Sequence, residues 1–208
     1  MEDDALSPVA VVVLGQLARG PKHAYEVYRT LKQHGEERRV RLTVGAVYHA
    51  VDRLERLEYV TAAGTHREGG RPERTTYAIT DAGRRAYLCS VRSLVRCPRP
   101  SYPAFEIGLS QLAALPRETA IEALSERRDS IAADRDSLAA LLDRVLGSGL
   151  PRRYLLDGLY EVDALDHQLR WIDTTVAELG SGELDWDGPV PADCRRPPDP
   201  ADPDQTHP

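Results

Sequence analysis

The stretch LTVGAVYHAVDRLERLEYV, Leu42 to Val60, decides the fold of this 208-residue chain. Its apolar residues recur at the i, i+3, i+4 and i+7 positions of one helix face, namely Val47, Ala50, Val51 and Leu54. Thr43 is placed to cap this helix, and Gly45 lets the helix start approach another surface closely. Such a start suits a phosphate or a groove. An ordinary packed helix is the favoured interpretation of this stretch when it is taken by itself.

Two further helices are predicted ahead of this stretch. Ser7 and Pro8 have the pattern of a helix cap and a first helical residue, and Gly20-Pro21 ends that helix. A second helix is expected from about His23 to His34, with Gly35 as the left-handed residue after its end.

After the central stretch the apolar spacing changes to the period of two that is typical of strands. Residues 59–63 and 75–80 are β-prone, and the segment between them is rich in glycine and arginine. This pattern predicts a hairpin whose loop carries Arg67, Arg71 and Arg74. Arginines on a loop are often simply solvated, but here they are candidates for phosphate or minor-groove contacts.

Three helices followed by an arginine-tipped hairpin is the element order of a winged helix–turn–helix. The charge distribution agrees with a nucleic-acid partner for this part of the chain. Residues 5–95 carry 15 Lys and Arg against 9 Asp and Glu, giving +6, whereas residues 96–208 carry 12 against 21, giving −9. A basic first part and an acidic second part indicate a DNA-contacting module joined to a domain that does not contact DNA.

The second part predicts helices only. A connecting helix is expected over residues 81–95, a short helical segment over 103–115, and then two long helices separated by the loop 147–151. The first long helix has an apolar seam that Arg128 and Arg135 interrupt. A short loop between long helices favours antiparallel packing, and a pair this thin needs a partner subunit to cover its apolar faces. The candidate dimerisation residues are Leu155, Val162, Leu165, Leu169, Trp171, Ile172 and Val176.

The predicted fold class is therefore mainly α, with an N-terminal winged helix–turn–helix that has a two-stranded wing, and a C-terminal antiparallel helical dimerisation domain. The expected domains are residues 1–95, including the connecting helix, and residues 96–182. Residues 183–208 are rich in proline and aspartate, so we expect a disordered tail in which Trp186 is able to dock locally.

Three motifs in this order resemble the PadR family of transcriptional regulators. They are HAYEV (23–27), GAVYHAVDRLE (45–55) and GRPERTTYAITDAGR (70–84), and the resemblance spans about residues 6–94. The segments AFEI (104–107) and LRWI (169–172) are similar to the C-terminal domain of the longer, virulence-activator-like members. Two departures stand out: His49 occupies a position where the family usually has proline or a small residue, and Glu58 one where it usually has glycine.

The resemblance implies a homodimer that binds a double-stranded DNA operator, most often as a repressor relieved by a small hydrophobic or aromatic effector. The central helix would then enter the major groove, and the wing would hold the flanking backbone. The DNA-binding residues expected are Tyr25, Thr43, Gly45, Tyr48, His49, Arg53, Arg67, Arg71 and Arg74. An effector pocket would involve Tyr87, Tyr102, Tyr154 and Tyr160, for which helix packing is the plainer explanation.

Two other functions are open at this point. One is a thiol- or metal-responsive switch on the same scaffold that uses Cys89 and Cys97. The other is a protein-interaction module that has lost DNA recognition, against which the basic first part argues. The three cysteines form no CxxC pair and the histidines have no ligand spacing, so neither a metal site nor a cofactor is expected.

An enzyme is not expected, because the sequence contains no nucleophile–base pair or glycine-rich phosphate loop. The longest apolar run, residues 9–14, is too short to cross a bilayer, and the acidic start differs from a secretory signal. These features predict a cytoplasmic protein without a membrane partner.

Overall fold

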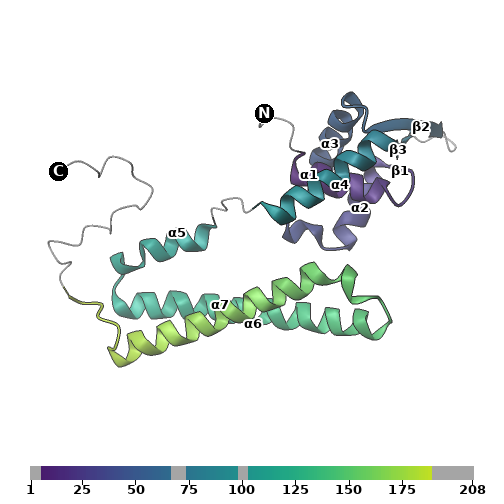
Figure 1. The fold of residues 1–208 in the computed structure, drawn as a ribbon. Helices are drawn as coiled ribbons and strands as arrows, with labels where there is room; N and C mark the ends of the chain where they lie inside the picture. The colour runs from purple at the N-terminus through teal and green to yellow at the C-terminus, as the bar shows by residue number, and fades with distance from the viewer. Residues whose placement is uncertain (1–5, 67–73, 98–102, 189–208) are drawn as a thin grey trace, which may run out of the picture. The chain divides into compact units, whose positions relative to one another are not determined.

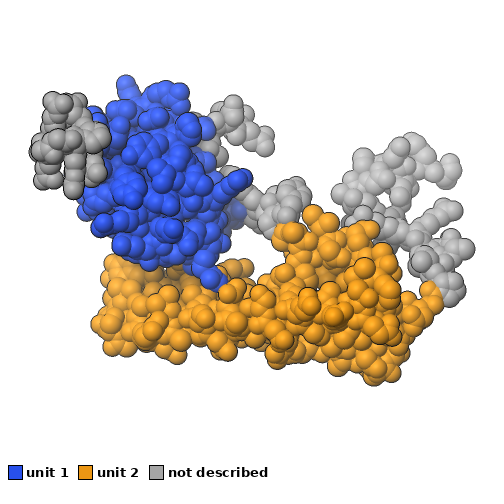
Figure 2. Space-filling view, turned by 180° about the vertical axis from the view of Figure 1, so that it is seen from behind, with its two compact units in different colours: residues 1–100 blue, residues 101–208 orange. Residues whose placement is uncertain are grey.

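The computed structural model describes residues 6–66, 74–97 and 103–188. The chain divides into two compact units, residues 1–100 and residues 101–208, which Figure 2 shows in separate colours. The first unit holds the predicted three helices and hairpin, and the second holds the predicted long helices.

Unit 1 has the element order of a winged helix–turn–helix, which confirms the predicted class (Figure 1). Its elements are α1 (Pro8–Leu17), β1 (Lys22–His23), α2 (Ala24–Gln33), the short 3-10 turn η1 (Glu36–Arg38), α3 (Val44–Arg56), β2 (Val60–His66), β3 (Arg74–Ile79) and α4 (Asp81–Arg96).

Local capping signals explain where the helices of unit 1 begin and end. The Ala10 amide donates to Ser7 Oγ over 3.3 Å at the start of α1, and the Ala46 amide donates to Thr43 Oγ1 over 3.0 Å at the start of α3. Gly35 follows α2 in the left-handed conformation, with φ 73°. The caps predicted at these three positions are confirmed.

The predicted two-stranded wing is present as β2 and β3, and a short third strand, β1, completes an antiparallel sheet in the order β1-β3-β2. Lys22 is opposite Tyr77, and His23, the expected start of the second helix, is opposite Thr76 and directly precedes α2. A two-residue strand has no periodicity of its own, which is why the sequence pattern did not reveal it. A bulge between Ala62 and Gly64 interrupts the pairing of β2 with β3.

The core of unit 1 is formed where α1, α2 and α3 meet. The predicted stripe of α3 is buried, with Val47 and Leu54 fully inaccessible, and it packs with Leu14 of α1 and Val27 of α2. Tyr87 of α4 packs against the same core. This packing fixes α3 from one side only and leaves its opposite side in solvent.

Unit 2 is an antiparallel pair of long helices with a short helix beside it (Figure 1). Leu124, Ile131, Ile172 and Leu179 form its buried cluster. The helices come close near the loop, where a Cβ added to Gly158 would lie 2.9 Å from Leu142 Cδ2. The elements are α5 (Ala104–Ser110), η2 (Leu112–Ala114), α6 (Arg117–Gly147), η3 (Arg152–Tyr154) and α7 (Leu156–Ser181).

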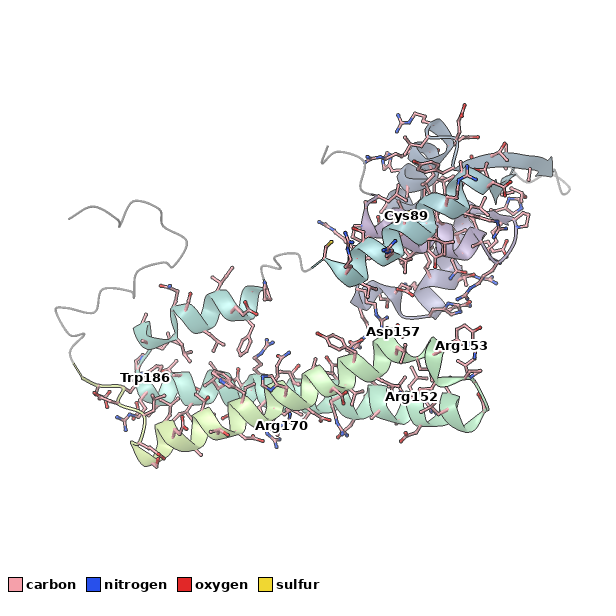
Figure 3. The ribbon with its side chains drawn as sticks, in the orientation of Figure 1. Cys89, Arg152, Arg153, Asp157, Arg170 and Trp186 are labelled. Carbon is pink, nitrogen blue, oxygen red and sulfur yellow. The ribbon has the colours of Figure 1, made fainter. Side chains whose placement is uncertain are left out.

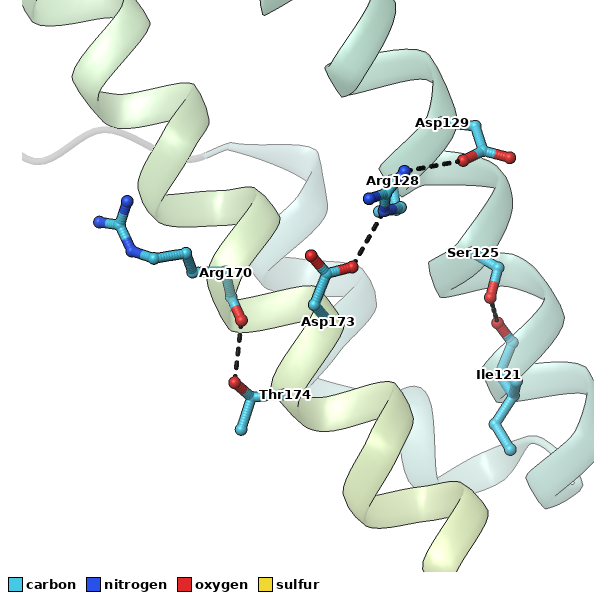
Figure 4. A network of polar contacts seen from close by, with 7 residues as sticks. All are labelled: Ile121, Ser125, Arg128, Asp129, Arg170, Asp173 and Thr174. Atoms are coloured by element: carbon cyan, nitrogen blue, oxygen red, sulfur yellow. Dashed lines mark hydrogen bonds and ion pairs between the residues drawn. The ribbon is translucent and has the colours of Figure 1, made fainter.

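The arginines that interrupt the apolar seam of α6 bind carboxylates of α7. Arg128 Nε donates to Asp173 over 2.9 Å, as Figure 4 shows, and Arg135 Nε donates to Asp166 over 2.8 Å. The two arginines are seven residues apart on α6, and their partners are seven residues apart on α7 in the reverse direction. The pairs therefore match only one antiparallel register of the two helices.

Helix α7 ends at the left-handed Gly182, and Trp186 then packs back onto the helices of unit 2 (Figure 3). Its indole Nε1 donates to the Leu115 carbonyl oxygen over 2.9 Å, and its ring packs against the buried cluster. The beginning of the expected disordered tail is thus ordered by a specific contact. Residues 189–208 lie outside the described part of the chain.

Candidate nucleic-acid interface

The exposed side of α3 presents a mixed polar surface next to the helix start. Thr43 caps the helix, and the space around Gly45 is open, since nothing lies within 4 Å of a Cβ placed there. Tyr48 is 46% exposed and His49 is also exposed. The free amides of the first helical turn and these side chains share one end of the helix, which is where winged-helix proteins contact base edges.

Arg53 and Arg56 are exposed in the last turn of α3. Arg53 was predicted as a DNA-binding residue and Arg56 was not. Arg56 follows His49 by seven residues, so the helical period places both on the same side. That spacing is the signal by which Arg56 could have been found.

The negative charges of α3 act on a tyrosine of strand β3. Burial raises the pKa of Tyr77 above its ordinary value, and the negative charges of Glu55 and Asp52 raise it further. Asp52 is itself exposed and stands between His49 and Arg56 along the helix.

The base of the wing is fixed to the end of α3 by Thr80. Its hydroxyl Oγ1 donates to the Glu58 carbonyl oxygen over 2.8 Å and also accepts from the Gly83 amide over 3.0 Å. Glu58 has φ 58°, the left-handed region that favours glycine. This conformation explains physically why glycine is usual at this position in the family that the sequence resembles.

Tyr25 projects from the first turn of α2. It is 51% exposed, and its ring centroid lies 6.1 Å from that of Tyr28, which packs against the core. Beside it, Lys22 forms an ion pair with Glu26 at 3.8 Å. The start of α2 thus carries an exposed hydroxyl suited to a phosphate contact.

Of the three wing arginines predicted to bind DNA, Arg74 begins β3 opposite His66. Arg67 and Arg71 lie outside the described residues.

The four tyrosines predicted for an effector pocket occupy different environments. Tyr87 packs in unit 1, where its hydroxyl lies 3.2 Å from a Cβ placed on Gly15. Tyr154 and Tyr160 are exposed in unit 2, and the Arg153 guanidinium lies 4.6 Å from the Tyr154 ring centroid. Tyr102 is outside the described residues.

The two cysteines of the alternative switch hypothesis lie along one helix. Cys89 is exposed on α4 (Figure 3), and Cys97 directly follows that helix. Eight residues of helix separate Cα atoms by about 12 Å, far more than the ~7 Å limit for a disulfide. A bond between them within one chain would require α4 to unwind.

The predicted dimerisation residues divide into two groups. Ile172 is fully buried inside its own unit, and Leu165, Leu169 and Val176 pack on the same cluster. Their apolar surface already stabilises the α6–α7 pair. Trp171 is 40% exposed, with its ring edge-on to Phe105. Leu155 and Val162 are half-buried.

Neither a metal site nor a membrane segment is found in the described ranges. No group of three His, Cys, Asp or Glu side chains there is arranged to hold a metal ion. No helix there is long and apolar enough to cross a bilayer.

Residues 13–88, which include α2, α3, the wing and half of α4, match the model of the transcriptional regulator PadR-like family. A search of curated proteins finds no match.

Solved structures share the fold over most of the chain. PadR of Bacillus subtilis in complex with operator DNA has a TM-score of 0.69 and 17% identity, covering 82% of this chain and 96% of that one. The same protein in complex with p-coumaric acid has a TM-score of 0.63 and 16% identity, covering 85% and 99%. A PadR-like transcriptional regulator of Bacillus cereus has a TM-score of 0.60 and 15% identity, covering 84% and 99%.

Proposed function

Because residues 13–88 form a domain of the PadR-like transcriptional regulator family, we propose that this protein is a homodimeric, sequence-specific DNA-binding repressor. The observation that carries the proposal is the exposed start of α3, with Thr43, Gly45, Tyr48 and His49 at one end of a helix whose other side is buried in the core. A DNA partner also implies a cytoplasmic location.

In the proposed complex, α3 enters the major groove with its first two turns. Thr43, Gly45, Tyr48 and His49 face base edges and adjacent phosphates. Arg53, the additional Arg56 and Tyr25 contact the backbone on either side, and Arg74, together with Arg67 and Arg71, contacts the flanking phosphate or minor groove. Base contacts give sequence preference, whereas phosphate contacts give affinity that falls with salt.

The proposed dimer forms through unit 2. After the two long helices have packed on each other, large apolar side chains remain exposed near the loop end of the pair and on the middle of α7. They include Leu141, Leu156, Tyr160 and Trp171. Burial of such a surface against a second copy is favourable by about 25 cal/mol per Å² of apolar area. A two-fold dimer would present two α3 helices to a pseudo-palindromic operator.

We further propose a small aromatic or hydrophobic effector. The support is the similarity to a fold that has been solved with p-coumaric acid in the Bacillus subtilis protein. Tyr87, Tyr102, Tyr154 and Tyr160 remain the candidate side chains for this chain. Titration with p-coumaric acid as the probe should release bound DNA, and an unchanged DNA affinity at millimolar concentrations would exclude p-coumaric acid as the effector.

DNA binding is tested by selecting duplexes from a random library with the full chain and measuring their affinity. Replacement of His49 with alanine should relax the selected sequence, whereas Arg53→Ala should weaken all duplexes alike and lower the salt slope by about one. Arg144→Ala, which removes an exposed positive charge from unit 2, is the matched control. Failure to select any duplex would refute the proposal.

The dimer is tested separately by sedimentation equilibrium. Tyr160 is 75% exposed, so Tyr160→Asp should leave the helix content unchanged while it weakens self-association. A wild-type chain that remains monomeric at micromolar concentration would contradict the dimer, with no consequence for the DNA-contacting role of α3.

A further inference from the structure

His23 connects helix α2 with the middle strand of the wing. It is the second residue of β1 and the residue before α2, and its Cα is paired with that of Thr76. Its ring Nδ1 lies 3.0 Å from the Thr75 carbonyl oxygen. A carbonyl oxygen only accepts, so Nδ1 is the donor in this arrangement. The Thr76 hydroxyl lies beside the same edge of the ring, 3.3 Å from Nδ1 and 3.4 Å from Nε2.

We propose that His23 is a positioning residue for DNA binding, one that holds strand β3, and with it Arg74, at a set distance from the start of α2. This inference rests on the proposed function and assigns a role to a residue of the HAYEV motif that does not itself contact DNA. His23 therefore holds the exposed Tyr25, at the start of α2, in a fixed position relative to the first residue of β3.

The small size of β1 makes these side-chain bonds important. The β1–β3 ladder has only two residue pairs, Lys22 with Tyr77 and His23 with Thr76. The His23 ring adds a bond to the next residue, Thr75, which is only one position from Arg74. The ring is half-buried, so solvent competes only partly for its bonds. Without the imidazole, the outer end of β3 would be held by β2 alone.

The position of α3 does not depend on His23. That helix is fixed by the burial of Val47, Val51 and Leu54 and by its cap at Thr43. The end of α3 is joined to the wing base through Thr80 and Glu58, at the other end of the sheet from Thr75. Loss of the imidazole should therefore disturb the phosphate contacts of the wing and leave base recognition by α3 intact.

The test compares three variants of the full chain on a duplex selected by the wild type. His23→Ala removes the donor, and His23→Asn keeps an N–H close to the position of Nδ1. His34→Ala, an exposed histidine at the other end of α2, is the matched control. Each variant is measured for affinity at several salt concentrations, for discrimination against a duplex with altered half-sites, and for thermal unfolding.

For His23→Ala we expect about fivefold weaker binding and a salt slope lower by about one, with the discrimination ratio unchanged. His23→Asn should recover both the affinity and the salt slope. Improved capping of α2 by asparagine would not by itself restore the salt slope. His34→Ala should match the wild type.

The role of His23 is overturned if His23→Ala behaves like His34→Ala. It is equally overturned if His23→Ala loses discrimination in proportion to affinity and unfolds at a lower temperature, since a general structural role would then explain the loss. A wild type that binds no duplex would instead refute the proposed function, so the two failures are distinguishable.

Discussion

Gly83, in the first turn of α4, lies directly against the carbonyl group of Tyr59, so that a Cβ at Gly83 would overlap with the Tyr59 carbonyl oxygen. The obstacle is backbone, which cannot rotate away as a side chain could. The same carbonyl accepts from the Thr80 amide over 3.0 Å. The segment between α3 and β2 and the start of α4 are thus in contact without any intervening side chain.

Gly83→Ala should therefore destabilise unit 1 by about 2 kcal/mol or more, because the methyl group can be accommodated only by a shift of the wing base or of α4. Urea unfolding followed by circular dichroism measures the change. Gly45→Ala is the control within the same unit, because nothing lies within 4 Å of its added Cβ. It should be neutral or stabilising by up to ~1 kcal/mol, as helix propensity requires. Equal stability of the two variants would contradict the contact.

Glu58 holds a left-handed conformation that disfavours a residue with a Cβ. Glu58→Gly relieves this cost of about 1–2 kcal/mol but adds freedom to the unfolded chain. The free energy of unfolding should rise by up to ~1 kcal/mol, which is measured as a higher midpoint in urea unfolding. Glu58→Val should destabilise, because a β-branched residue tolerates positive φ poorly. If the Glu58→Val variant is as stable as the Glu58→Gly variant, the left-handed conformation does not limit stability at this position.

The stability of unit 2 should depend on pH through Asp166. The hydrogen bond from Arg135 lowers the pKa of this carboxyl below its ordinary value of 3.8. A lowered folded pKa gives stabilisation that is present above the ordinary value and lost as the pH falls through the folded pKa. Asp166→Asn should thus unfold at a lower temperature than the wild type near pH 6, with the difference vanishing in strong acid. If the two unfolding temperatures still differ in strong acid, the loss in Asp166→Asn comes from packing and not from the charge of the carboxylate.

Asp52 should limit binding to unrelated DNA. Its exposed carboxylate stands between His49 and Arg56 along α3, so in the proposed complex it would repel phosphates and could accept only from a donor such as the cytosine amino group. Asp52→Asn should raise affinity for random duplex about threefold by removing this repulsion. Competition between selected and random duplexes measures the ratio, which should fall. An unchanged ratio would place Asp52 away from the DNA.

Local signals were sufficient for the parts of the fold that depend on neighbouring residues. Ser7, Thr43 and Gly35 bond or turn within a few positions of themselves, so their roles could be read directly from the sequence. The buried stripe of α3 was likewise predictable from its period. The exposed residues of α3 follow from the same period, Arg56 among them, although Arg56 is absent from the predicted DNA-binding set.

Features that depend on distant partners could not be predicted in this way. The pairing of β1 requires Thr76 and Tyr77, more than fifty positions later in the chain. Arg128 and Arg135 interrupt the apolar seam when α6 is considered alone. Their partners, Asp173 and Asp166, lie on α7, so the ion pairs cannot be predicted from α6. The composition of residues 183–208 predicts disorder with local docking of Trp186 left open, and the acceptor of its indole, the Leu115 carbonyl oxygen, is 71 positions earlier in the chain.

The bulge at Gly64 has a consequence for how copies of this protein meet. Strands β1 and β2 are the two edges of the sheet, and β2 is the longer of them, because β1 has only two residues. An open edge can template the addition of a strand from another molecule, and this is a route to fibrils. The break between Ala62 and Gly64, with Gly64 at φ 153°, removes the regular row of donors and acceptors that such growth would need. Wing-to-wing polymerisation is thereby opposed at strand β2.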